Sequence, residues 1–155
     1  MYFVPAFSGL FSPHWDETAR GSLFGLTRFS NKSHLARAVL ESVAFQTYEL
    51  LESMEKDLDT KFDTLKVDGG MVANNLLMQF QSDLLDKSIQ SQEINEITAL
   101  GVGVASYLYV MDLPLSSMGN YITSSKTWNP NMSNETRINS LESWYKAIEK
   151  AKNWL

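Results

Sequence analysis

Cysteine and an excess of basic residues are both missing from this sequence. Because there is no cysteine, disulfide bonds and metal sites built on thiolates are excluded. Lysine and arginine number 13 against 18 acidic residues, which gives a net charge of −5. A surplus of positive charge is what draws a protein to a nucleic-acid backbone or an anionic membrane surface. We therefore expect no nucleic acid and no membrane surface among its partners.

Long apolar runs are missing as well. No stretch reaches the length of about 18 apolar residues that a membrane-spanning helix needs. The opening residues, Met1 to Phe7, have neither the basic start nor the long apolar run of a secretory signal peptide. We therefore expect no membrane insertion and a cytoplasmic location.

The residues that are present suit one compact core. The 155 residues are 44% hydrophobic and 20% charged, and their apolar periodicity and turn residues predict strands that alternate with helices. The expected strands lie at 2–7, 22–27, 64–68 and, more weakly, 88–92, and the expected helices at 33–56, 73–85, 97–111 and 134–155. This order predicts an α/β fold in which helices cover a mostly parallel sheet.

Two helices and one connection carry further expectations. The helix at 97–111, for which Asn95 is a candidate cap, is apolar nearly all round and should be buried. Prolines and small polar residues predict an irregular connection at 113–133. Residues 1–112 would then form the domain core, and 134–155 a surface helix of the same domain. The helix at 33–56 carries an apolar stripe at three- and four-residue steps, made of Leu35, Val39, Val43, Gln46, Leu50 and Met54.

The sharpest local motif follows the strand at 64–68, where Gly69 and Gly70 come directly after Asp68. A glycine pair lets the backbone adopt positive φ and come close to a flat ligand such as a purine ring. Asn74 could hydrogen-bond an adenine edge, and Asp68 could face a metal-bound phosphate through water. The alternative is a tight turn in which Asn74 caps the next helix and Asp68 stabilises the turn. Spacing alone leaves both interpretations open.

Other catalytic patterns are not found. There is no Walker loop and no Gly-x-Gly-x-x-Gly after a strand. No pair of carboxylates or Ser-His arrangement can be argued, so we predict no catalytic residue and no metal ligand. His14 has no acidic partner near it in sequence and is interpreted as a structural or interface residue, and His34, near a helix start, as a surface residue.

Several segments resemble the glycerol kinase branch of the FGGY carbohydrate kinase family. The first begins with Val4-Pro5-Ala6-Phe7-Ser8-Gly9-Leu10 and ends at Trp15. A second is similar to the family's second signature, in which spaced glycines precede a polar residue that opens an apolar helix. Residues after 112 agree more loosely. The similar segments, in the family's order, are 4–15, 21–41, 41–47, 67–83 and 96–101.

This resemblance implies an actin-like, ribonuclease H-like ATPase fold in which two domains close on ATP and substrate. The chain would be most of the second domain, without its first hairpin and without the amino-terminal domain that holds glycerol and the catalytic base. By position, Gly70 would contact the adenine nucleotide through its backbone and Asn74 through its side chain, with Gly69 and Asp68 as neighbours. The implied ligands are ATP or ADP with Mg²⁺, and glycerol only together with the amino-terminal domain.

Three functions remain open on these grounds. The chain is expected to be the ATP-binding fragment of a glycerol kinase, inactive alone; a truncated or split module that binds adenine nucleotide or serves in assembly; or part of another FGGY sugar kinase. An apolar face left without a partner would favour a homo-oligomer or pairing with an amino-terminal kinase half. Where the family usually ends a helix with glycine, this chain has Asp86, which should weaken that helix end.

Overall fold

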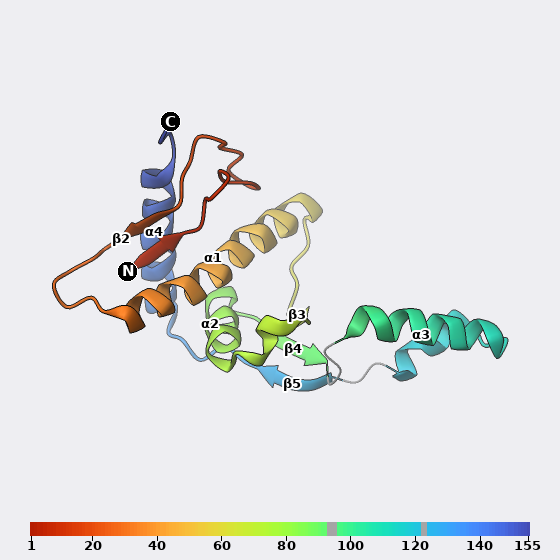
Figure 1. Cartoon of the computed structure of the whole chain (residues 1–155). Helices are drawn as coiled ribbons and strands as arrows, with labels where there is room; N and C mark the ends of the chain where they lie inside the picture. The colour runs from red at the N-terminus through yellow and green to blue at the C-terminus, as the bar shows by residue number, and fades with distance from the viewer. Residues whose placement is uncertain (93–95, 122–123) are drawn as a thin grey trace.

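The computed structural model describes residues 1–92, 96–121 and 124–155. In these described residues there are two small sheets and four α-helices (Figure 1). Strands β1 (Tyr2–Val4) and β2 (Ser22–Phe24) form an antiparallel pair. The second sheet has the order β3-β4-β5, made of Thr64–Val67, Ser88–Gln92 and Ser124–Trp128. The helices are α1 (Lys32–Leu58), α2 (Asn75–Leu85), α3 (Ile97–Val110) and α4 (Asn134–Ala151).

All the predicted strands and helices are present in the predicted order, but the structure has one further strand and the sheets differ from the expectation. Among the described strands, β3 and β4 pair in parallel, while the β1–β2 and β4–β5 pairs are antiparallel. The strand β5 lies within 113–133, where an irregular connection was expected, and a 3-10 helix (Leu115–Tyr121) precedes it. β5 escaped prediction because its residues Ser124-Ser125-Lys126-Thr127 are polar, and its order comes from hydrogen bonds to β4 rather than from apolar periodicity.

Both ends of helix α1 are capped by residues that satisfy backbone hydrogen-bonding groups. The Asn31 side chain accepts hydrogen bonds from the backbone N–H groups of Ser33 and His34, and the His34 ring accepts one from the Asn31 N–H. This reciprocal arrangement closes the first turn. At the other end Asp59 takes the left-handed conformation, with φ of 47°. His34 is exposed, as the sequence suggested.

The core lies between α1, α2, α4 and the β1 strand. The Phe45 ring of α1 stacks on Trp144 of α4 at 4.8 Å between centroids and meets Phe80 of α2 edge-on at 5.6 Å. Trp144 is fully buried. Aromatic pairs of this kind add roughly 1 kcal/mol each to the energy of burial alone. The closing helix α4 is thus part of the core that the amino-terminal elements form.

Most of the apolar stripe predicted on α1 does not face this core, although Val43 packs against it. Leu35, Val39, Leu50 and Met54 are between 40% and 49% exposed. The buried face carries Ala38, Ser42, Phe45 and Glu49 instead. The helix was predicted correctly, and most of its apolar stripe lies outside the core because β1, α2 and α4 pack against another side of α1. A second apolar face therefore remains on the surface.

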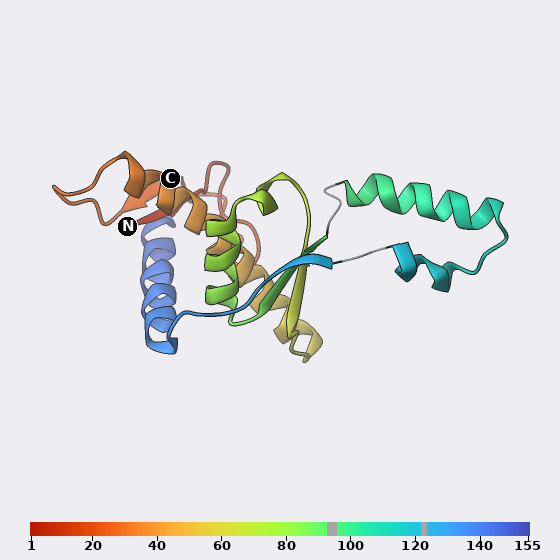
Figure 2. The ribbon, with the colours of Figure 1, turned by 90° about the horizontal axis from the view of Figure 1, so that it is seen from below.

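Helix α3 is also less buried than expected. In the described structure only Val104 and Leu108 of α3 are buried, and Val102, Tyr109 and Val110 are 66%, 89% and 78% exposed. Figures 1 and 2 show α3 extending away from the other helices, with the 3-10 helix beside it. Asn95, the candidate cap, lies outside the described residues. The prediction of a buried helix is wrong here, because its apolar sides meet few described elements. No described helix combines the length and apolarity needed to cross a bilayer.

Candidate functional site

The glycine motif forms the turn between β3 and α2. A short 3-10 helix, η1 (Gly70–Ala73), follows β3 and leads directly into α2 (Figures 1 and 2). The turn therefore brings Asp68, Gly69, Gly70 and Asn74 together at the carboxyl end of a strand and the start of a helix. Ligands of α/β proteins commonly bind at such strand ends. All four predicted residues are thus in one place.

Gly69 and Gly70 occupy their positions for different reasons. Gly69 has φ of 92° and ψ of 174°, a conformation essentially limited to glycine. Gly70 has no positive φ that would need glycine, and a Cβ added to it would meet no atom within 4 Å. The backbone turn explains Gly69. Neither conformation nor the chain's own packing explains Gly70, which faces open space.

Asn74 is the N-cap of α2. Its side-chain Oδ1 accepts hydrogen bonds from the backbone N–H groups of Leu76 and Leu77, each at 3.1 Å. Capping, one of the two roles that the sequence left open for Asn74, is therefore observed. It uses only the oxygen of the amide, so Nδ2 remains for another interaction. Capping and ligand binding do not exclude each other at this residue.

The neighbours of the turn come from the sheet and from α2. Val67 pairs with Ser91 of β4, and Ser91 pairs with Lys126 of β5, so the three residues lie in one row across the sheet. The Lys126 ammonium donates to Oδ1 of Asn75, the residue after the cap. Asp68 is exposed beside the glycines. The result is an open surface with donor groups on one side and a carboxylate at its edge.

His14 has an acidic partner that the sequence did not reveal. His14 Nε2 lies 2.7 Å from Oε1 of Glu49, and the Glu49 side chain is only 4% exposed. Burial raises the pKa of Glu49, and the hydrogen bond with His14 opposes that rise. The pair ties the loop at 8–14 to α1 beside a cavity of about 280 Å³. Glu49 stands 35 positions away in sequence, so only helical periodicity on the buried face of α1 could have signalled it.

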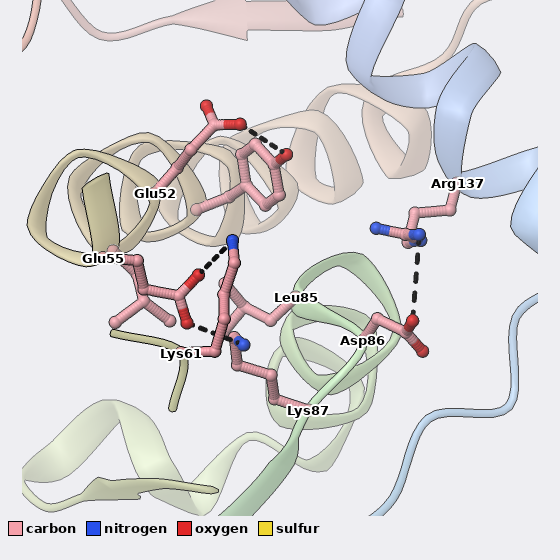
Figure 3. Close-up of a pocket in the computed structure, with 9 residues that line it drawn as sticks. Glu52, Glu55, Lys61, Leu85, Asp86, Lys87 and Arg137 are labelled. Atoms are coloured by element: carbon pink, nitrogen blue, oxygen red, sulfur yellow. Dashed lines mark hydrogen bonds and ion pairs between the residues drawn. The ribbon is translucent and has the colours of Figure 1, made fainter. Parts of the chain in front are cut away.

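A second buried acid, Glu55, lies in a different cavity, of about 210 Å³ (Figure 3). Its oxygens are 2.8 Å from Lys87 Nζ and 3.0 Å from Lys61 Nζ, and one of them accepts the Phe62 N–H. The Lys87 hydrogen bond is the main reason that the pKa of Glu55 is lowered to about 2. Figure 3 shows Arg137 pointing toward Asp86 across the same cavity. The lysines and the arginine that line this cavity are paired with acidic side chains. These ion pairs therefore link α1, α2 and α4 and do not form a charged ligand site.

More than half of the sequence matches a known family model. That model, the C-terminal domain of the FGGY family of carbohydrate kinases, matches residues 1–107. The chain belongs to the FGGY family of carbohydrate kinases. The match places the glycine turn and Asn74 within the part of an FGGY kinase that the model covers, and the resemblance seen in the sequence is confirmed.

Relatives of this FGGY kinase chain are much longer than the chain itself. It is 50% identical to a glycerol kinase of Nocardia farcinica over 99% of its own length and 32% of the relative's. It is 46% identical to a glycerol kinase of Chloroflexus aurantiacus over its full length and 31% of the relative's. The chain thus spans about a third of the length of these relatives.

Solved structures confirm the predicted fold class. The glycerol kinase of Plasmodium falciparum, solved with ADP, superposes with a TM-score of 0.87 at 35% identity, over 97% of this chain and 30% of that one. A xylulose kinase of Lactobacillus acidophilus gives a TM-score of 0.74 at 24% identity, over 96% and 30%, and that likeness shows the fold alone. The FGGY chain has the actin-like ATPase fold of these kinases and covers under a third of them.

Proposed function

We propose that this chain is the adenosine-binding part of a glycerol kinase, which in its complete form transfers the γ-phosphoryl group of ATP to the sn-3 hydroxyl of glycerol. The proposal agrees with the names of the relatives at 45% to 50% identity. In it, the base of ATP or ADP lies on the turn after β3, with the Gly70 main chain and the Asn74 amide against it. Residues 1–112 and 134–155 act as one domain.

The observation that carries this proposal is Gly70. The chain's own conformation and packing place no demand for glycine there, since an added Cβ would meet nothing within 4 Å. A flat ligand that lies on the main chain would explain the glycine, because any side chain at this position would keep the ligand away from the backbone. The Asn74 amide, already held by its capping bonds, is pre-oriented to donate from Nδ2 to the same ligand.

Mg²⁺ would enter with the phosphates of ATP. Asp68, exposed at the end of β3 beside Gly70, is the acidic residue of the turn that would face a metal-bound phosphate through water. Phosphoryl transfer depends on positioning and on charge stabilisation around the phosphates. A surface that holds only the base should therefore give almost no turnover, and glycerol would require the amino-terminal domain.

The Asn74 variants separate the two roles of this residue. Asn74→Ala removes both the cap and the amide donor, whereas Asn74→Ser retains a capping oxygen and loses the amide. Loss of the cap should cost about 1 kcal/mol of stability in the first variant and little in the second. Both variants should bind ADP more weakly than the wild type, whose affinity for a half-pocket we expect near millimolar, or about −4 kcal/mol. Equal ADP binding by Asn74→Ser and the wild type, measured by NMR titration, would refute the assignment.

Activity provides a separate test. In a coupled assay with glycerol and Mg-ATP, the 155-residue chain should show no turnover, whereas intact kinases typically reach about 1 to 100 per second. Adding an amino-terminal FGGY kinase half in trans should restore some activity if the exposed faces of α1 and α3 accept it. Turnover by the chain alone at an ordinary kinase rate would contradict the proposal.

A further inference from the structure

Helix α2 is tied to β5 and to the segment after β5 by a row of hydrogen bonds. The residues of α2 that make these bonds lie at helical spacing, so they share one face of the helix. They are Asn75, Gln79, Ser82 and Asp83, and their partners are, in this order, the Lys126 ammonium, the Asn129 carbonyl, the Trp128 carbonyl and the Asn131 N–H. Because Asn75 is the first residue of α2, its bond to Lys126 is the one nearest to the glycine turn.

The first turn of α2 needs this bond more than the rest of the helix does. Leu77 and Met78 are buried, but apolar packing is non-directional and does not by itself fix where the first turn points. Among the described residues, the bond from Lys126 to Asn75 is the hydrogen bond that links this turn to the sheet. The other three bonds of the row lie at least one helical turn further on.

The Lys126 side chain is itself held in place. Its backbone is fixed by the pairing of Lys126 with Ser91 of β4. Its Nζ lies 4.9 Å from the centroid of the Trp128 ring, and Trp128 is buried. A cation over the face of an indole ring is attracted by the ring, which restricts the lysine to few conformations. Lys126 is therefore a fixed donor and not a freely moving surface side chain.

Through these contacts Lys126 connects the two ends of the glycine turn. Strand β3 ends at Val67, which pairs with Ser91, and Ser91 pairs with Lys126. Helix α2 begins at Asn75, which accepts a hydrogen bond from the same lysine. The residues between these two ends, 68–74, are thus closed into a ring by contacts through β4 and β5. The placement of the start of α2 relative to the end of β3 therefore does not depend on the turn alone.

On the basis of the proposed function, we propose that Lys126 is a positioning residue of the nucleotide site. It acts through Asn75 and not on the nucleotide. Its ammonium holds the start of α2 against the sheet, so that the Gly70 main chain and the Asn74 amide reach the same base. Without this link both groups are still present, but they move relative to each other, and ordering them on binding costs affinity.

The test compares ADP with adenosine, which has the same base and ribose and no phosphate. The full ¹⁵N-labelled chain is titrated with each, and the Gly70 backbone amide is followed. Lys126→Met keeps an apolar side chain on the Trp128 ring and loses the ammonium, so it should weaken adenosine and ADP binding by the same factor, about fivefold. Lys126→Arg can still donate to Asn75 and should bind both ligands within about twofold of the wild type.

Lys66→Met is the matched control, because it removes one exposed positive charge from β3. The Lys66 side chain points to the other face of the sheet from that of Val67, so this variant should leave adenosine binding unchanged. Weaker ADP binding by Lys126→Met with unchanged adenosine binding would show that Lys126 acts on the phosphates through its charge. That result would overturn the inference.

A double-mutant cycle tests whether Lys126 acts through Asn75. Asn75→Ala should weaken adenosine binding as much as Lys126→Met does, and the two changes together should cost no more than either alone. Urea unfolding of each variant gives its folded fraction, so that a loss of stability is not counted as a loss of binding. Losses that multiply, or wild-type affinity in Lys126→Met, would overturn the inference and leave the nucleotide site standing. No shift of any wild-type signal with either ligand would instead remove the proposed function, and this inference with it.

Discussion

Gly69 and Gly70 are adjacent in sequence, yet the structure requires glycine at the first and leaves the second unconstrained. This difference gives a prediction that separates folding from binding. Gly69→Ala should lower the free energy of unfolding by about 1–3 kcal/mol, because φ of 92° with ψ of 174° is strained for any side chain. Gly70→Ala should leave stability unchanged or raise it by about 0.5 kcal/mol, and should weaken ADP binding by keeping the base off the main chain.

Urea unfolding and ADP titration of the two glycine variants check this prediction together. Gly70→Ala should have a denaturation midpoint equal to or slightly above that of the wild type, while it binds ADP more weakly. If Gly70→Ala binds ADP as tightly as the wild type, the open space at Gly70 has no role in binding. A large loss of stability in Gly70→Ala would mean that the turn itself requires glycine at both positions.

The buried carboxylate of Glu55 gives a prediction about pH. Its pKa is lowered from 4.5 to about 2 in the folded chain, chiefly by the hydrogen bond from Lys87. A lowered pKa means that the folded chain holds the carboxylate ionised where the unfolded chain would protonate it. The stabilisation is therefore fully present above about pH 4.5 and is lost as the pH falls toward 2.

Glu55→Gln tests this linkage. At pH 7 the variant should be less stable by about 3 kcal/mol, because it leaves the half-buried Lys87 ammonium without its charge partner. Below pH 4.5 the difference between variant and wild type should shrink, as seen in urea unfolding measured across the acid range. A difference that stays constant from pH 7 to pH 2.5 would contradict the assignment. The matched variant Glu52→Gln controls for removal of a nearby acid on the same helix.

At the scale of elements, the C-terminus of α2 shows how a local departure from the family pattern is accommodated. Asp86, where the resemblance implies a glycine, takes the left-handed conformation with φ of 55°. Asp86→Gly should stabilise the chain by about 1 kcal/mol by removing this strain. The variant also removes the ion pair between Asp86 and Arg137, but this pair contributes little to stability because it is 3.8 Å long and partly exposed.

Thermal unfolding measures the change in stability. Asp59→Gly, at the left-handed end of α1, is the matched variant and should give a similar gain. A drop in the unfolding temperature of Asp86→Gly would contradict this interpretation of the helix end.

Helices and strands with strong periodicity were predictable, whereas pairings across the chain were not. The helix α1 follows from a long run without glycine or proline and from its apolar stripe, so sequence alone placed it. The strand β5 is polar and depends on hydrogen bonds to β4. No local sequence pattern indicates these hydrogen bonds. In the glycine turn, the positive φ of Gly69 and the cap at Asn74 were predictable because both are local properties. The partners His14 and Glu49 were missed because they meet only in the folded chain.

Periodicity also predicts that a face is apolar without saying what will cover it. Leu35, Val39, Leu50 and Met54 form a stripe of correct helical spacing, and α3 is apolar on most sides. Both surfaces are exposed in the described chain. The expectation that α3 is buried assumed that its partner lies within these 155 residues, and a helical pattern does not contain this assumption.

At the scale of the whole molecule, the exposed faces predict self-association. Apolar surface of this extent on a chain without a partner promotes contact between copies. Replacing Val110, which is 78% exposed on α3, by lysine should reduce the apparent mass at high concentration and lower the binding of a hydrophobic dye. Asn139→Lys, which adds the same charge on the polar side of α4, serves as control and should change neither. A wild-type chain that elutes as a clean monomer and binds no dye would contradict the prediction.

The central claim is that the bend after β3 holds a nucleotide base against its main chain. The most direct measurement is a set of intermolecular nuclear Overhauser effects between the adenine H2 and H8 protons of bound ADP and the protein. The account predicts contacts to the Gly70 α-protons and to the Asn74 side-chain amide. Contacts to the His14–Glu49 cavity or to the Glu55 cluster instead, or no contacts at any site under saturating ADP, would contradict it.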